Sequence, residues 1–388
     1  MTTVQPFRVD VPQPVLDDLR ERLARARWPE AVDGAAWDYG TDLDYLRGLA
    51  DYWWDGFDWR SAEAKVNEFA QFRASIDGLG IHFVHERGRG PDPLPLVLTH
   101  GWPDTFYRYS KVIPLLADPA RFGGDPADAF DVVVPSVPGF GFSDRPRERG
   151  MTSVRVAALW ARLMTDVLGY GRYGAAGGDI GSMVTQFLAL SHPGSVVGIH
   201  LTDIGFYFLN AGQPDLSEAE RAYVASIQQW WMQEGAYAML HSTKPQTLAY
   251  GLNDSPVGLA AWLVEKFRSW SDCDGEVERR FTRDELLTQI MLYWVTGTIG
   301  SSIRLYYEGG HAPPSIQPGQ RIEVPAGFAV FKDNPVPLPR AYAERHLDVR
   351  HWTEMPRGGH FAAWEEPELF VEDLRAFFRP LRSSSRAG

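Results

Sequence analysis

The sequence predicts an α/β fold with a mostly parallel, doubly wound sheet, and three observations support this. Apolar strand-like segments alternate with helical segments from PLPLVLTHG to HPGSVVGIHLTD, as parallel βαβ units require. A long, mostly helical stretch then interrupts the alternation, and strand character returns only after it. A glycine-rich turn, GGDIG at residues 177–181, also stands where a strand is expected to pass into a helix.

These patterns divide the chain into four parts. Residues 1–72 are predicted to form a helical meander that clamps a larger body, because its tryptophans need a partner to pack against. Residues 73–205 form the first part of the core, which opens with a hairpin in IDGLGIHFVHERG. Residues 206–309 are predicted to be a helical lid. Residues 310–388 complete the core with the strands VPAGFAVF and DVRHWTEM and a final helix.

Composition and charge exclude several classes of protein. The 388 residues, 44% of them apolar, can fill a large core, and the net charge of −12 argues against nucleic acid or an anionic membrane as a partner. The single cysteine, Cys273, cannot form an internal disulfide or a cysteine-based metal site. The chain shows neither a signal-peptide pattern nor a run of eighteen apolar residues, so we expect a cytoplasmic protein. A homodimer is compatible with this composition.

The GGDIG turn predicts a nucleophile elbow of the α/β-hydrolase type. In that turn, a sharp passage from strand to helix lifts one side chain clear of the sheet, and its neighbours must be small. Asp179 takes the nucleophile's position between Gly177 and Gly181. A carboxylate is an anion at neutral pH, so it can displace a leaving group at a saturated carbon by forming an ester. Taken alone, however, GGD is equally typical of an ordinary turn.

Two further segments supply the groups that such a nucleophile needs. HGWP follows the strand PLPLVLT, so the backbone N–H groups of Trp102 and Ile180 are the expected oxyanion donors. His360 lies in a glycine-rich loop before the final helix, where this architecture places its histidine. An imidazole there can act as the general base for a hydrolytic water.

Six motifs together resemble the microsomal-type epoxide hydrolases, in the bacterial soluble branch with the N-terminal meander. They are HGWP, PGFGFSD, GGDIG, STKPQTLAYGLNDSPVGLAAW, MLYWVTGTIGSS and RGGHFAAWEEPE. The resemblance implies an α/β-hydrolase fold with a lid, and hydrolysis of an epoxide to a vicinal diol through an ester on Asp179, without cofactor or metal. It also implies two lid tyrosines that hold the epoxide oxygen, which fall on Tyr237 and Tyr306. The resemblance extends to hydrolases of bacterial natural-product pathways, including those that make enediyne antibiotics.

The sequence departs from the family at two positions. The family's orienting acid falls on Asn334, which is not a carboxylate; Asp333 precedes it and is favoured here, with Asp203 as the second candidate. Asn334 itself could accept the histidine's hydrogen bond but would stabilise an imidazolium less. Asp104 stands where the family usually has glycine, and it is expected either to cap the following helix or to add charge near the pocket mouth.

Two other functions are compatible with these residues. A haloalkane dehalogenase shares the aspartate, the histidine and the lid, and Trp102 stands where one of its halide donors would be. A non-catalytic receptor on the same fold would explain the missing acid. The epoxide interpretation is favoured by the STKP and YWVTGTI segments, and the aromatic residues of lid and meander indicate a sizeable apolar or aromatic epoxide.

Overall fold

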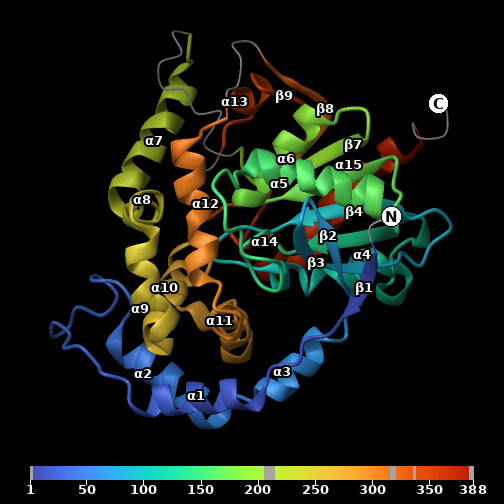
Figure 1. The fold of residues 1–388 in the computed structure, drawn as a ribbon. Coiled ribbons are helices and arrows are strands. Elements are labelled where there is room, and N and C mark those ends of the chain that lie inside the picture. The colour runs from blue at the N-terminus through green and yellow to red at the C-terminus, as the bar shows by residue number, and fades with distance from the viewer. Residues whose placement is uncertain (1–2, 205–214, 315–319, 335–337, 384–388) are drawn as a thin grey trace.

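The computed structural model of the protein describes residues 3–204, 215–314, 320–334 and 338–383. In this part of the chain a single sheet has the strand order β1-β2-β3-β5-β4-β6-β7-β8-β9 (Figure 1). Strands β1, β2, β3 and β5 pair antiparallel, whereas every pairing from β5 through β4 to β9 is parallel. The strands are β1 Val4–Phe7, β2 Gln71–Ile76, β3 Leu79–Glu86, β4 Leu94–Thr99, β5 Phe130–Pro135, β6 Tyr173–Gly177, β7 Val196–Leu201, β8 Ile322–Val330 and β9 Leu347–Glu354.

Helices cover both faces of the parallel part, so the predicted doubly wound α/β-hydrolase architecture is confirmed. Helices α5 (Ser153–Arg162) and α6 (Ile180–Ser191) pack against each other, and α4 (Val112–Ala117) packs against α15 (Pro367–Ser383). The inner strands between them are mainly apolar, and β5 and β7 are buried at every position. Such continuous burial is typical of strands covered on two faces.

The N-terminal segment is not purely helical, contrary to the prediction, because β1 adds to the edge of the sheet through β2. Its helices are α1 (Gln13–Ala24), α2 (Leu43–Asp51) and α3 (Trp59–Val66), and they run along the lid at the end remote from α7 (Figure 1). Arg22 Nη1 pairs with Asp254 Oδ1 at 2.6 Å, and Thr41 Oγ1 donates to the carbonyl of Ala261 at 2.7 Å. The helices of the meander therefore clamp the lid, whereas β1 joins the sheet.

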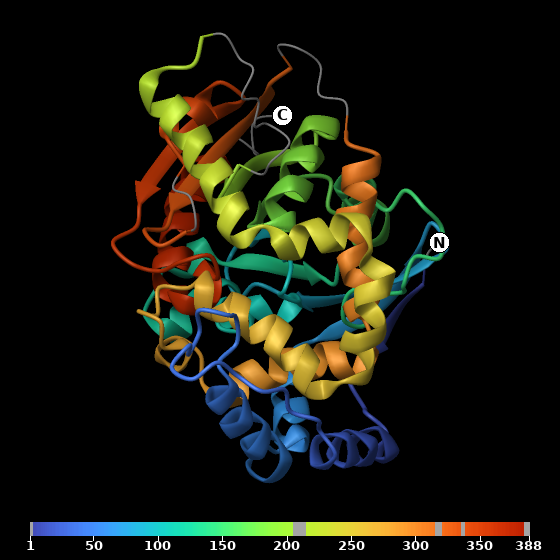
Figure 2. The ribbon, with the colours of Figure 1, turned by 90° about the vertical axis from the view of Figure 1, so that its left-hand side faces the viewer.

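In the described part of the chain between β7 and β8, the lid contains six α-helices (Figure 2). They are α7 Glu218–Glu234, α8 Ala236–Thr243, α9 Pro245–Asp254, α10 Pro256–Ser269, α11 Arg283–Thr296 and α12 Ile299–His311. Capping boxes, in which Ser217 and Thr282 are the caps, start α7 and α11. The predicted lid start at 206 lies outside the described residues, and α12 runs two residues past the predicted end at 309.

No helix of the described chain has the length and apolar character that crossing a membrane requires.

Candidate active site

The nucleophile elbow joins β6 to α6, and Asp179 occupies its tip. Asp179 has φ +58° and ψ −129°, a strained conformation for a residue with a side chain. A Cβ on Gly177 would lie 2.4 Å from the carbonyl oxygen of Gly181, and one on Gly181 would lie 1.9 Å from that of Thr99. Both flanking positions therefore require glycine, as the GGDIG pattern indicates.

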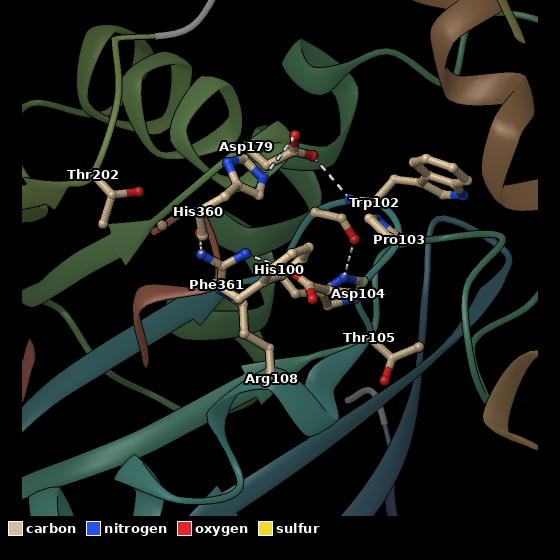
Figure 3. Close-up of polar contacts among 12 residues, drawn as sticks. His100, Trp102, Pro103, Asp104, Thr105, Arg108, Asp179, Thr202, His360 and Phe361 are labelled. Atoms are coloured by element: carbon tan, nitrogen blue, oxygen red, sulfur yellow. Dashed lines mark hydrogen bonds and ion pairs between the residues drawn. The ribbon is translucent and has the colours of Figure 1, made fainter. Parts of the chain in front are cut away.

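The Asp179 carboxylate is held as an anion. The Trp102 N–H donates to Asp179 Oδ1 at 2.9 Å, and the Ile180 N–H also donates to this carboxylate. His360 Nε2 lies 3.5 Å from Asp179 Oδ2 (Figure 3). Burial opposes ionisation, but His360 and the two amides outweigh it, so the pKa of the Asp179 carboxyl is lowered. The two amides expected from the sequence thus converge on the predicted nucleophile.

The loop between β9 and α14 (Ala362–Glu365) carries His360 and is held through its main chain. The His360 N–H donates to the carbonyl of Trp270 in the lid at 2.8 Å. The N–H groups on either side, of Gly359 and Phe361, donate to the Glu365 carboxylate at 3.0 and 2.8 Å. The Trp270 ring meets the imidazole edge to face at 5.2 Å between centroids. These contacts place the imidazole over Asp179.

The three candidates for the orienting residue lie in different surroundings. Asp203, at the end of β7, accepts the Asp179 N–H on Oδ2 at 2.8 Å and lines the same cavity as His360. Burial raises the pKa of Asp203, whereas the charge on His360 acts to lower it. Asn334 also lines this cavity and donates from Nδ2 to the carbonyl of Thr202 at 3.2 Å.

Asp333, the favoured candidate of the sequence analysis, is exposed. Its carboxyl group is paired with that of Asp272, and burial and this neighbour raise the pKa of Asp333. The backbone explains this placement. The Asp333 N–H donates to the carbonyl of Gly358 at 3.1 Å, and Asp333 forms an isolated parallel β-bridge with Gly359. The structure therefore brings Asp203 and Asn334, and not Asp333, into the cavity beside His360.

Two lid tyrosines line the same cavity as Asp179. Tyr237 lies on α8 and Tyr306 on α12, and their hydroxyl groups are hydrogen bonded to each other. The Tyr237 ring stacks on Trp102 at 5.3 Å between centroids, with 11° between the planes. Burial, and the charge on Asp179, raise the pKa of both phenols well above the ordinary value. Both hydroxyls are therefore protonated donors at neutral pH.

The cavity that joins these groups has a volume of about 300 Å³. Its wall is mainly aromatic and aliphatic; the lid contributes Tyr223, Ile227, Trp230, Trp231 and Trp270. In the described ranges, no group of three histidine, cysteine, aspartate or glutamate side chains is arranged to hold a metal ion. The arrangement offers a carboxylate nucleophile, a base and two proton donors around a mainly apolar pocket.

Asp104 takes neither of the two roles predicted for it, and its partner Arg108 was not predicted. The cap of the following turn is Thr105, whose hydroxyl accepts from the Tyr107 N–H, and Asp104 is buried away from the pocket mouth. Asp104 pairs with Arg108, which donates from Nη2 to the His360 carbonyl at 2.7 Å (Figure 3). The i, i+4 spacing of aspartate and arginine was the available signal, but in most helices such a pair is solvent-exposed.

Two family models match the chain. The model described as "Epoxide hydrolase N terminus" matches residues 4–109, and the one described as "alpha/beta hydrolase fold" matches residues 95–245. The chain is 43% identical to a Stigmatella aurantiaca protein provisionally named an epoxide hydrolase, over 98% of this chain and 86% of that protein. It is 36% identical to epoxide hydrolase 1 of Sus scrofa, over 97% of this chain and 88% of the relative.

Solved structures agree with these relatives. The epoxide hydrolase of Aspergillus niger superposes with a TM-score of 0.86 at 32% identity, covering 98% of this chain and 97% of that one. The juvenile hormone epoxide hydrolase of the silkworm Bombyx mori superposes with a TM-score of 0.85 at 27% identity, covering 99% and 95%. The likeness therefore includes the meander and the lid as well as the core.

Proposed function

The chain belongs to the epoxide hydrolase family of the α/β-hydrolase fold, and on that premise we propose that Asp179 is the nucleophile of its epoxide hydrolysis. The observation that carries the proposal is a single cavity lined by Asp179, Tyr237 and Tyr306, in which the Asp179 charge acts on both phenols. An epoxide between them meets an anion on one side and two donors on the other.

In the first step, an Asp179 oxygen attacks one epoxide carbon from the side opposite the ring oxygen. The carbon–oxygen bond of the ring breaks, and Tyr237 and Tyr306 donate hydrogen bonds and a proton to the leaving alkoxide. A bare alkoxide in an apolar pocket is costly, so these donors lower the barrier where the charge develops. The product of this step is a glycol monoester of Asp179.

In the second step, His360 removes a proton from water, and the hydroxide attacks the carboxyl carbon of the Asp179 ester. The N–H groups of Trp102 and Ile180 stabilise the oxyanion of the tetrahedral intermediate. The ester bond then breaks, the imidazolium of His360 returns its proton to the leaving alkoxide, and the diol departs. The proton left on the Asp179 carboxyl group returns to the tyrosinate formed in the first step, so both groups regain their starting states. One solvent oxygen has entered Asp179.

Asp203 is the proposed orienting carboxylate for His360, in place of Asp333. It shares the cavity with His360, and its oxygen already holds the Asp179 N–H at 2.8 Å. A carboxylate there stabilises the imidazolium that forms when His360 takes its proton. Asp333, exposed and paired with Asp272, has no such position.

The proposed substrates are apolar or aromatic epoxides, because tryptophan and tyrosine rings together with aliphatic side chains form most of the cavity wall. A place in a natural-product pathway, a cytoplasmic location and a homodimer stay predictions from the sequence. To test the activity, diol formation from styrene oxide and bromide release from 1-bromobutane are measured in parallel. Diol without bromide is expected; bromide release instead would favour the dehalogenase, and tight binding without turnover would favour the receptor.

A further inference from the structure

A buried ion pair lies beneath the elbow and the histidine loop, and the two steps above do not use it. Asp104 is 0% exposed and Arg108 is 1% exposed, and Arg108 Nη1 contacts Asp104 Oδ2 directly. The loss of hydration of two buried charges offsets much of their attraction, so an apolar pair of similar size would often be as stable. Stability alone gives little reason for an ion pair at this point.

The guanidinium of Arg108 touches both halves of the catalytic machinery. Its Nη2 donates to the carbonyl of His360 at 2.7 Å (Figure 3). A Cβ built on Gly178, the residue before Asp179, would lie 3.0 Å from the same nitrogen. One planar group therefore lies between the loop that carries the base and the turn that carries the nucleophile. A hydrogen bond from a charged donor is also stronger than a neutral one.

Asp104 fixes where that guanidinium lies, and the lid fixes Asp104. The carbonyl of Asp104 accepts from Tyr293 Oη at 2.8 Å, and that of Pro103 accepts from Gln289 Nε2 at 2.9 Å. Tyr293 and Gln289 both lie on α11 of the lid. The same turn presents the Trp102 N–H to Asp179. The lid, the oxyanion turn and the histidine loop are thus connected through Asp104 and Arg108.

We propose that Asp104 and Arg108 are a positioning pair that fixes the His360 imidazole relative to Asp179 for ester hydrolysis. The proposal rests on the proposed function, in which His360 acts only in the second step. The contacts of Glu365 and Trp270 keep the loop folded without Arg108, so losing the pair shifts the imidazole rather than releasing it. A misplacement of about 1 Å costs a step about 10²-fold.

The test separates ester formation from ester hydrolysis in the variant Asp104→Asn/Arg108→Met. This double change removes both charges and leaves no lone charge buried. Rapid-quench samples with styrene oxide are analysed by intact mass for the ester on Asp179. We expect hydrolysis of the ester to slow by about 10²-fold, formation to change little, and the ester-bound fraction to rise at steady state. Because both rates come from the same folded molecules, a loss of folded protein does not change their ratio.

A matched control exists on α15. Arg375 is also buried; it pairs with Glu372 and donates from Nη2 to the carbonyl of Leu115 at 2.8 Å, outside the cavity lining. Glu372→Gln/Arg375→Met is expected to leave the ratio of the two rates unchanged. Should the double variant at Asp104 not fold, Arg108→Lys keeps the charge beside Asp104 but replaces the two-pronged guanidinium by one ammonium. We expect the same accumulation of ester.

Equal slowing of both steps, or an unchanged ratio in the folded variants, would overturn the positioning role. An equal shift of the ratio in the control at Arg375 would overturn it too. A wild-type enzyme that forms no ester on Asp179 would overturn the proposed function and this inference with it. If the wild type forms the ester and the variants keep its ratio of formation rate to hydrolysis rate, this inference alone would be overturned.

Discussion

At the scale of single residues, the sequence and the structure favour different carboxylates for orienting His360: Asp333 and Asp203, respectively. Changing Asp203 to Asn keeps the shape but removes the charge that stabilises the imidazolium, so the hydrolysis of the ester should slow by about 10²- to 10⁴-fold. Asp333→Asn is the control, since Asp333 is exposed and paired with Asp272. Single-turnover rates of ester hydrolysis decide between them. A large fall of this rate in Asp333→Asn, with none in Asp203→Asn, would identify Asp333 as the orienting acid, as favoured from the sequence.

The lid tyrosines act in the other step. Replacing Tyr237 or Tyr306 by Phe removes one donor to the developing alkoxide, and a hydrogen bond to a charged group corresponds to roughly 10- to 10²-fold in rate. Ester formation should slow, and more in the double variant. Tyr307→Phe is the matched control, because Tyr307 stacks on His311 at 3.9 Å and is not part of the cavity wall. Measured ester formation that is equal in all variants would exclude the donor role.

The raised pKa values of the same phenols predict how the rate of ester formation responds to pH. Their pKa values are raised well above the usual one, chiefly by burial, so both stay protonated as the solution passes through the ordinary phenol pKa of about 10. The rate of ester formation should therefore show no fall that belongs to these tyrosines near pH 10. Rapid mixing into buffers from pH 7 to 10 checks this. A fall near pH 10 that disappears in the Phe variants would show that the phenols titrate normally.

At the scale of elements, the elbow depends on two glycines that leave no room for a side chain. Gly181→Ala would place a carbon 1.9 Å from the carbonyl oxygen of Thr99, so β4 and α6 must separate. We expect a loss of about 1–3 kcal/mol in the free energy of unfolding, together with loss of ester formation. Gly194→Ala is the control, because a Cβ there meets nothing within 4 Å. Denaturant unfolding measures both; equal stabilities would mean that the elbow tolerates a side chain.

Elements were also the scale at which the sequence was most informative. The helix after GGDIG, the strands before Trp102 and Asp203, and the late loop of His360 all follow from local apolar spacing, which decides each element by itself. The edge strand β1 was missed because its four residues, VQPF, bury no continuous face and depend on pairing with β2. Arg108 and Glu365 were missed for a related reason: each also bonds a backbone group distant in the chain, the carbonyl of His360 and the N–H of Asp272 respectively. Local patterns carry no information about such contacts.

At the scale of the whole molecule, a buried cluster helps join the last helix to the sheet. Asp373 of α15 accepts from His200 of β7 at 2.7 Å and from His351 of β9 at 2.8 Å. Although burial opposes ionisation, these partners lower the pKa of Asp373 to about 2. The stability that follows from this shift is complete above the unfolded pKa of about 3.9 and is lost as the pH falls towards 2.

The prediction is that Asp373→Asn loses about 2 kcal/mol of unfolding free energy at pH 6, and that the difference from wild type shrinks between pH 4 and pH 3. Urea unfolding over this range measures it. Asp33→Asn provides the control, because Asp33 is an exposed carboxylate at the molecular surface. A difference that does not depend on pH would mean that Asp373 has no lowered pKa.

The account as a whole depends on a covalent ester on Asp179, and the path of one oxygen atom tests this most directly. Limiting styrene oxide is converted by excess enzyme in water enriched in heavy oxygen, so that each molecule turns over once. Because water attacks the carboxyl carbon of Asp179, the diol should carry no label and the peptide that contains Asp179 should carry it. Labelled diol with an unlabelled Asp179 peptide would mean that water opens the epoxide directly, and would contradict the account.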